Sequence, residues 1–141
     1  MNKLDTLDPE FKAKIEQLIQ GVSQVTGRTW IVTSGGRTMA EQKVIYAQGR
    51  NGDTRPIVSN APPGSSAHNF NLAADLAPLK LDGTIDWNVP DKMWKLMADL
   101  AVEMGLTAGY YFKSFHDAPH VEDPGWKIEQ AAWKAGTLVL A

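Results

Sequence analysis

The stretch HDAPH, residues 116–120, places two histidines four positions apart, with an aspartate directly after the first. This is the spacing of the metal-binding HExxH motif, in which one helix points both rings at a single ion. Pro119 argues against such a helix, because proline has no backbone N–H and disfavours the α conformation for Ala118. The segment is therefore expected to be extended or turned, so that at most one of His116 and His120 binds a metal.

Working outward from this segment, cap and turn residues divide the chain into mixed helices and strands. Asp-Pro pairs at 8–9 and 123–124 resemble helix starts, and Thr38 with Glu41 has the spacing of a capping box. The predicted helices run from Pro9 to about Gly27, from Thr38 to about Gly49, across 93–104, and from Pro124 to about Ala135. The predicted strands are 29–33, 72–78, 106–112 and 119–122, with turns at 34–37 and 81–86. Since there is no regular βαβ alternation, we expect an α+β fold with an antiparallel sheet.

Composition predicts one ordinary globular domain over residues 1–141. The chain has 141 residues, 43% hydrophobic and 21% charged, enough to bury a core without disulfides or structural metals. The net charge of −2 predicts no nucleic-acid partner, and we expect a monomer. There is no cysteine, so any transition metal would depend on histidine and carboxylate ligands.

The first residues, MNKLDTLDPEFK, lack the apolar run of a signal peptide, and no segment of the sequence reaches membrane-spanning length. We therefore expect synthesis in the cytoplasm and no insertion into a membrane. A site of action elsewhere would require another component to release the protein.

A long loop follows the second predicted helix. Residues 50–66, RNGDTRPIVSNAPPGSS, are rich in Pro, Gly, Ser and Asn. Loops of this length inside a compact domain are commonly functional, so we expect this one to form the rim of a binding cleft.

The three histidines of the chain all lie near carboxylates. His68 precedes Asp75 by seven residues, and His116 and His120 flank Asp117. A catalytic zinc site needs three protein ligands, but no fixed spacing defines one. Spacing alone leaves a metal site and ordinary hydrogen-bonded histidines equally open.

Three ordered sequence blocks carry a family resemblance. SSAHNFNLAAD (65–75) resembles the SxHxxGxAxD signature of the zinc D-alanyl-D-alanine carboxypeptidase and L-alanyl-D-glutamate endopeptidase family. DAPHVE (117–122) resembles its second signature, and SGGRT (34–38) is similar to the turn that precedes both; Trp126 also fits. The resemblance implies a small antiparallel sheet flanked by helices, as in the hedgehog/D-Ala-D-Ala peptidase fold. The short single-domain form most resembles bacteriophage endolysins that cut the L-alanyl-D-glutamate bond of peptidoglycan.

The resemblance also implies a metal site. Zn²⁺ would be held by His68, Asp75 and His120, with water in the fourth position, and Asp117 would be the general base. Arg37 matches the family's arginine and would polarise the scissile carbonyl or anchor a substrate carboxylate. Without the other blocks, Arg37 would be taken for an ordinary residue of a surface turn.

Three further residues near these blocks have weaker assignments. Ser66 matches the signature serine and is a candidate donor near the metal ligands or a substrate contact. Glu122 would share the face of His120 in a strand and so support that ring, although a strand-end charge is an equal alternative. His116 is expected to be a solvent-exposed loop residue, with orientation of substrate or tuning of Asp117 as the alternative.

Asn71 stands where the family signature has glycine. Glycine there would permit a positive φ angle, and asparagine is the next most tolerant residue, so the turn is expected to survive. A nucleophilic triad of Ser66, His68 and Asp75 is a poor alternative, because no glycine pattern of a nucleophile elbow surrounds the serine.

These features predict a zinc peptidase acting on the stem peptides of peptidoglycan, with the L-alanyl-D-glutamate bond as its target. A D-alanyl-D-alanine carboxypeptidase is the first alternative, because loops such as 50–66 decide the bond and motifs do not decode them. A non-catalytic zinc-containing module that binds the cell wall is the second. Asp117 favours an enzyme, since a site without catalysis has no need of a base. The expected setting is an endolysin released by a membrane-permeabilising partner.

Overall fold

The computed structural model describes residues 2–140, which form four α-helices, four strands and three short 3₁₀ helices. The α-helices are α1 (Pro9–Thr26), α2 (Met39–Ala47), α3 (Asp91–Glu103) and α4 (Trp126–Lys134). The strands are β1 (Trp30–Ser34), β2 (Ala73–Pro78), β3 (Thr107–Ala108) and β4 (His120–Glu122), and the 3₁₀ helices are η1 (Lys3–Thr6), η2 (Ala67–Phe70) and η3 (Gly109–Tyr111). Within residues 2–140, none of the helices has the length and apolar character needed to cross a membrane.

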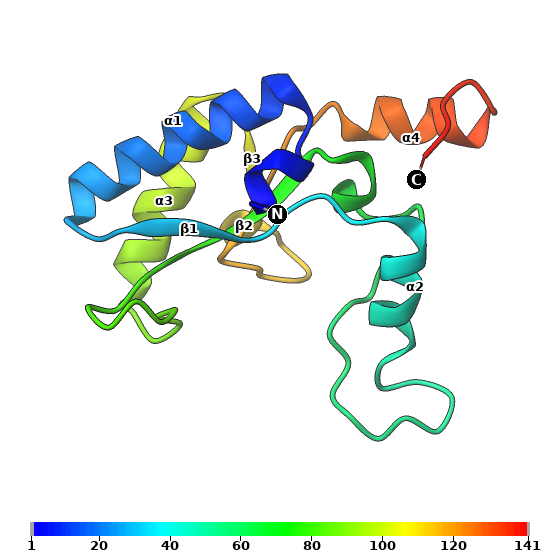
Figure 1. Ribbon diagram of the computed structural model, residues 1–141, viewed down its shortest axis with the longest axis horizontal. Helices are drawn as coiled ribbons and strands as arrows, with labels where there is room; N and C mark the ends of the chain where they lie inside the picture. Colours follow the sequence, from blue (N-terminus) through cyan, green and yellow to red (C-terminus); the bar gives the residue numbers. More distant parts are fainter. Residues whose placement is uncertain (1, 141) are drawn as a thin grey trace.

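The strands form one antiparallel sheet in the order β1-β2-β4-β3, which confirms the predicted α+β class. Helices α1 and α3 lie together over the sheet, whereas α2 and the loop after it extend away from it (Figure 1). The core lies between α1, α3 and the sheet. It includes the fully buried side chains Phe11, Ile15, Val22, Leu76, Met97 and Val121.

Local end signals set the helix boundaries where the sequence predicted them. The Asp8 carboxylate accepts a hydrogen bond from the Phe11 N–H at 3.2 Å, and α1 ends at Gly27, whose φ of 67° is left-handed. A capping box starts α2: the Thr38 backbone N–H donates to the Glu41 carboxylate, and the Glu41 backbone N–H donates to the Thr38 hydroxyl. These caps supply partners for backbone N–H groups that a helix end leaves free.

Several boundaries differ from the sequence prediction, most of them by one or two residues. The strand expected at 106–112 stops at Ala108, because Gly109 turns the chain into η3. The helix expected from Pro124 begins only at Trp126. Its aspartate does not cap the helix: Asp123 Oδ1 accepts from the Gly125 N–H at 2.8 Å and so closes a local turn ahead of α4.

The edge strand β1 contains a β-bulge. Val32 pairs with Leu76, but the next registered pair joins Ser34 to Asp75, so that Thr33 and Ser34 oppose one residue of β2. A bulge re-aims the side chains that follow it. Here it directs the Ser34 hydroxyl toward Arg37, whose Nη2 donates to it at 3.0 Å.

Candidate active site

Strand pairing places an acid beside an imidazole at the centre of the sheet. Asp75 of β2 and His120 of β4 are direct cross-strand partners, and such partners point to the same face. The adjacent pair, Ala74 and Val121, points to the opposite face and is fully buried in the core. The alternation of the two strands therefore directs Asp75 and His120 away from the core.

A second histidine reaches this face from η2. Ser66 caps that short helix, its hydroxyl accepting from the His68 N–H at 3.2 Å. Asn71 then takes a left-handed conformation, with φ of 60°, and leads the chain into β2. The expectation that Asn71 would preserve the turn in place of glycine is confirmed.

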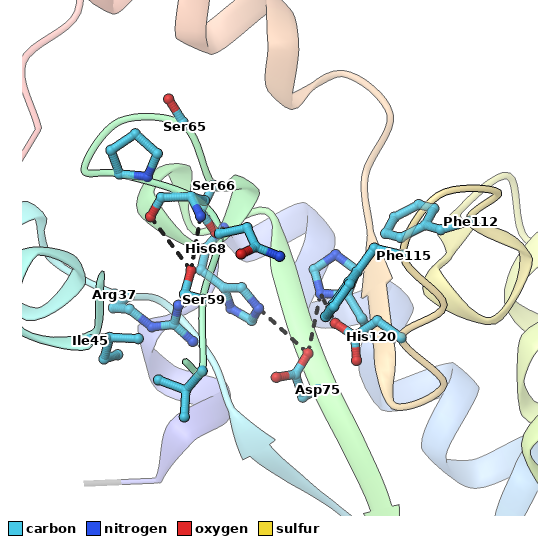
Figure 2. Close-up of a pocket in the computed structure, with 15 residues that line it drawn as sticks. Arg37, Ile45, Ser59, Ser65, Ser66, His68, Asp75, Phe112, Phe115 and His120 are labelled. Atoms are coloured by element: carbon cyan, nitrogen blue, oxygen red, sulfur yellow. Dashed lines mark hydrogen bonds and ion pairs between the residues drawn. The ribbon is translucent and has the colours of Figure 1, made fainter. Parts of the chain in front are cut away.

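His68, Asp75 and His120 each present a ligand atom within 4.8 Å of the others. The Asp75 carboxylate lies between the two rings (Figure 2), with Oδ1 at 3.4 Å from His68 Nε2 and 3.2 Å from His120 Nδ1. The structure thus brings together the three residues that the sequence blocks singled out as metal ligands.

The outer hydrogen bonds fix which nitrogen of each ring faces the centre. His68 Nδ1 lies 2.8 Å from the carbonyl of Gly35, which can only accept, so this nitrogen carries the hydrogen and Nε2 presents a lone pair. His120 Nε2 lies 2.7 Å from the Glu122 carboxylate, so in the neutral ring Nε2 carries the hydrogen and Nδ1 presents the lone pair. When both rings are neutral, two lone pairs and one carboxylate oxygen converge, and a cation between them would satisfy all three. The donor set suits Zn²⁺, which binds neutral imidazole and carboxylate.

Electrostatics favour a cation at the same point. Burial alone would lower the pKa of His120, but hydrogen bonds to Asp75 and Glu122 outweigh it and raise the pKa to about 9. Burial alone would raise the pKa of Asp75, but hydrogen bonds to His120 and His68 hold the pKa of that carboxyl well below its usual range. Positive charge is therefore favoured between these groups, whether a proton or a metal ion supplies it.

Asp117 lies beside the cluster, with its Oδ2 at 3.9 Å from His120 Nδ1. Burial raises the pKa of Asp117, and repulsion by Asp75 adds to the effect. Gly109 sets its backbone: the Asp117 N–H donates to the Gly109 carbonyl at 2.9 Å, and a Cβ at Gly109 would lie 2.3 Å from the Asp117 carbonyl oxygen. The close approach that ends β3 thus also positions this carboxylate.

The cluster lies in a cleft of about 630 Å³. Phe112 and Phe115 lie on one side of the cluster and Arg37 and Ile45 on the other (Figure 2). The end of the long loop also lines the cleft, through Val58, Ser59, Asn60, Ala61, Pro62, Ser65 and Ser66. The predicted place of this loop at the rim of a cleft is confirmed for residues 58–62, 65 and 66.

Of the residues with weaker assignments, Glu122 contacts a metal-ligand candidate and His116 does not. Glu122 contacts His120, as the strand periodicity predicted, and its other carboxylate oxygen accepts from the Trp126 indole N–H at 2.7 Å. His116 is exposed and outside the cluster, and its ring packs on Tyr110 with centroids 4.8 Å apart.

Sequence reasoning missed Gln42, a buried residue that accepts a hydrogen bond from Arg37 Nη1 at 2.8 Å. Its only sequence signal is a polar residue on the inner face of a helix.

A His-Asp-His group with a carboxylate beside it, on the floor of a cleft, has the ligands and base of a hydrolytic metal centre. The family model described as "VanY: D-alanyl-D-alanine carboxypeptidase" matches residues 4–129. The chain belongs to this family, which confirms the resemblance seen in the sequence blocks.

Relatives and solved structures agree with this assignment. The peptidoglycan L-alanyl-D-glutamate endopeptidase CwlK of Bacillus subtilis strain 168 is 35% identical over 99 residues, 65% of this chain and 59% of CwlK. The match thus spans less than two thirds of that relative. The fold is similar to that of the Serratia marcescens L-Ala D-Glu endopeptidase ChiX, with TM-score 0.59, 20% identity and coverage of 89% and 86% of the two chains. A VanY D,D-pentapeptidase E175A mutant in complex with Zn(II) gives TM-score 0.61 at 18% identity, covering 92% of this chain and 79% of that one. The predicted peptidase fold is confirmed.

Proposed function

We propose that the protein is a zinc-dependent peptidoglycan endopeptidase that hydrolyses the L-alanyl-D-glutamate bond of stem peptides. The observation that carries the proposal is the convergence of two imidazole nitrogens and one carboxylate oxygen in a cleft beside a second carboxylate. The likeness to CwlK, at 35% identity, supports the choice of bond.

In this proposal His68, Asp75 and His120 hold the zinc. When bound, zinc lowers the pKa of its water to about 7 and polarises a carbonyl group. Asp117 is the general base: its carboxylate takes a proton and later gives it to the leaving amine. Arg37 lines the cleft, and its guanidinium has more N–H donors than the two that bond to Gln42 and Ser34, so it would bind the carbonyl or a carboxylate of the substrate.

A D-alanyl-D-alanine carboxypeptidase is the second candidate, because the matching family model carries that description. The two activities need the same metal and base and differ in how the cleft walls hold the peptide. The test must therefore identify the product and not only detect hydrolysis.

The deciding experiment is mass spectrometry of purified peptidoglycan after incubation with the protein, with added zinc or with a chelator. We expect chelator-sensitive fragments with a new amino terminus on D-glutamate. Free D-alanine without such fragments would establish the carboxypeptidase instead. Absence of any product with zinc present would favour a non-catalytic wall-binding module.

The Asp117→Asn variant, assayed in parallel, tests the base. It should bind zinc as the wild type does and lose about 10²–10⁴-fold in turnover, the usual contribution of general base catalysis. Full activity of this variant would contradict the assigned role.

We further propose that the protein acts as an endolysin, made in the cytoplasm and released to the wall by a membrane-permeabilising partner. Expression in a susceptible host should leave culture density unchanged until a pore-forming protein is induced, and then cause lysis. The Asp117→Asn variant should not lyse under either condition. Lysis by the wild type without the pore former would contradict the need for a partner.

A further inference from the structure

Helix α2 is held to the protein by a polar side chain. Within this helix, all of which the structure describes, Gln42 is the one buried residue, with 0% of its surface exposed. A surface helix normally packs an apolar stripe against the core. A buried amide is tolerated only when its polar atoms are hydrogen-bonded, so the partners of Gln42 show what it does.

Those partners belong to the cleft. Gln42 Oε1 accepts from Arg37 Nη1 at 2.8 Å. Its Nε2 donates to Ser59 Oγ at 3.1 Å and to the Ala61 carbonyl at 2.7 Å. One side chain therefore joins the arginine of the site to the rim of the cleft.

The other contacts of the two partners are local. Within the rim, the Ala61 N–H donates to Ser59 Oγ at 3.1 Å. Ser59 and Ala61 are half-buried, and Asn60 between them is exposed. The neighbouring Val58 is 57% exposed, so apolar burial contributes little to holding the rim.

The Arg37 backbone N–H donates to the His68 carbonyl at 2.9 Å. Among residues 2–140, the Arg37 guanidinium has one further hydrogen bond, from Nη2 to the Ser34 hydroxyl, and Arg37 lines the cleft. The Gln42 amide is thus the common anchor of both groups.

We propose that Gln42 is a positioning residue that holds the Arg37 guanidinium and the rim at 59–61 in one arrangement before substrate binds. The inference rests on the proposed peptidase function. Gln42 is fully buried and acts through these two groups, without touching substrate. A wall formed in advance reduces the ordering cost of binding, so its loss should appear mainly in KM.

Two substitutions at Gln42 separate its contacts, and Gln48→Met is the matched control. Gln42→Met keeps the volume and removes all three hydrogen bonds. Gln42→Glu keeps an acceptor for Arg37 but sets a carboxylate against the Ala61 carbonyl. Gln48 donates to the Pro56 carbonyl on the same loop, outside the cleft lining.

For stem-peptide hydrolysis, we expect Gln42→Met to raise KM about tenfold, the effect of losing one or two buried hydrogen bonds, with zinc content and kcat nearly unchanged. Gln42→Glu should give a smaller rise, and Gln48→Met less than about a twofold change. In an Arg37→Ala background, Gln42→Met should add much less than its effect on the wild type, because contacting residues are not additive. Full additivity would show that Gln42 does not act through Arg37 and would overturn the inference.

A measurement without catalysis tests the same inference. By ¹⁵N relaxation, the amides of Ser59–Ala61 should be rigid in the wild type and in Gln48→Met, with order parameters near about 0.85, and fall below about 0.6 in Gln42→Met. Unchanged order parameters would overturn the positioning role even in a fully active protein. If the wild type cleaves no stem peptide, the proposed function fails, while this result still decides the role of Gln42.

Discussion

At the scale of single residues, the two histidines of HDAPH divide between the metal site and solvent. His120 faces Asp75 with Nδ1 and Glu122 with Nε2, whereas His116 is exposed on the loop. We expect His120→Ala to weaken zinc binding by more than about 100-fold, above the usual effect of losing an outer partner. His116→Ala should leave zinc binding unchanged. Titration calorimetry with Zn²⁺ measures both, and the reverse pattern would contradict the ligand assignment.

Glu122 has donors on both sides, the His120 ring and the Trp126 indole. An amide at this position can accept from one of them only, and must turn its own N–H₂ toward the other. Glu122→Gln should therefore loosen the His120 ring and weaken zinc binding about 10–100-fold. Glu129→Gln, on the exposed surface of α4, is the control and should have no effect. Equal zinc affinities for the two variants would show that Glu122 is only a strand-end charge.

At the scale of elements, the junction of β3 and η3 depends on a glycine. A Cβ at Gly109 would lie 2.3 Å from the Asp117 carbonyl oxygen and 2.9 Å from His120 Cβ, so Gly109→Ala must displace backbone. We expect a loss of about 1–3 kcal/mol in unfolding free energy, the usual cost of overpacking, and a reduced kcat. Chemical denaturation and kinetics check both effects.

Gly21 provides the matched control for that substitution. It lies inside α1, and a Cβ there would meet nothing within 4 Å. Gly21→Ala should therefore stabilise the protein by about 0.5–1 kcal/mol through helix propensity. Two Gly→Ala changes of opposite sign would separate the tertiary contact at Gly109 from the intrinsic preference of the backbone.

Elements defined by local signals could be predicted from the sequence, and elements defined by tertiary contact could not. The cap at Asp8 and the capping box at Thr38 act within one turn, so α1 and the start of α2 follow from short windows. The end of β3 depends on the approach of Gly109 to Asp117, which no local pattern contains. The same holds in the site. Sequence blocks identified the three candidate ligands, but the role of Gln42 depends on hydrogen-bond partners 17 and 19 residues away in the chain.

At the scale of the whole molecule, the metal site should couple to global stability. Its ligands come from η2, β2 and β4, so a bound ion would tie together segments that separate on unfolding. At a free zinc concentration of about 100 times Kd, binding adds about 2.7 kcal/mol, which for a domain of this size raises Tm by roughly 8–10 °C. Thermal scans with zinc and with chelator measure the difference. His120→Ala should show no such difference, and a shift that survives in this variant would place the ion elsewhere.

The bulge at Thr33 has a consequence for how the protein behaves at high concentration. The sheet has two edges, β1 and β3, each with backbone groups that another chain could pair with. The bulge interrupts the regular ladder of β1, and β3 is only two residues long. An irregular edge and a very short one are poor templates for an incoming strand. The β-bulge that turns Ser34 toward Arg37 therefore also disfavours aggregation through pairing of sheet edges.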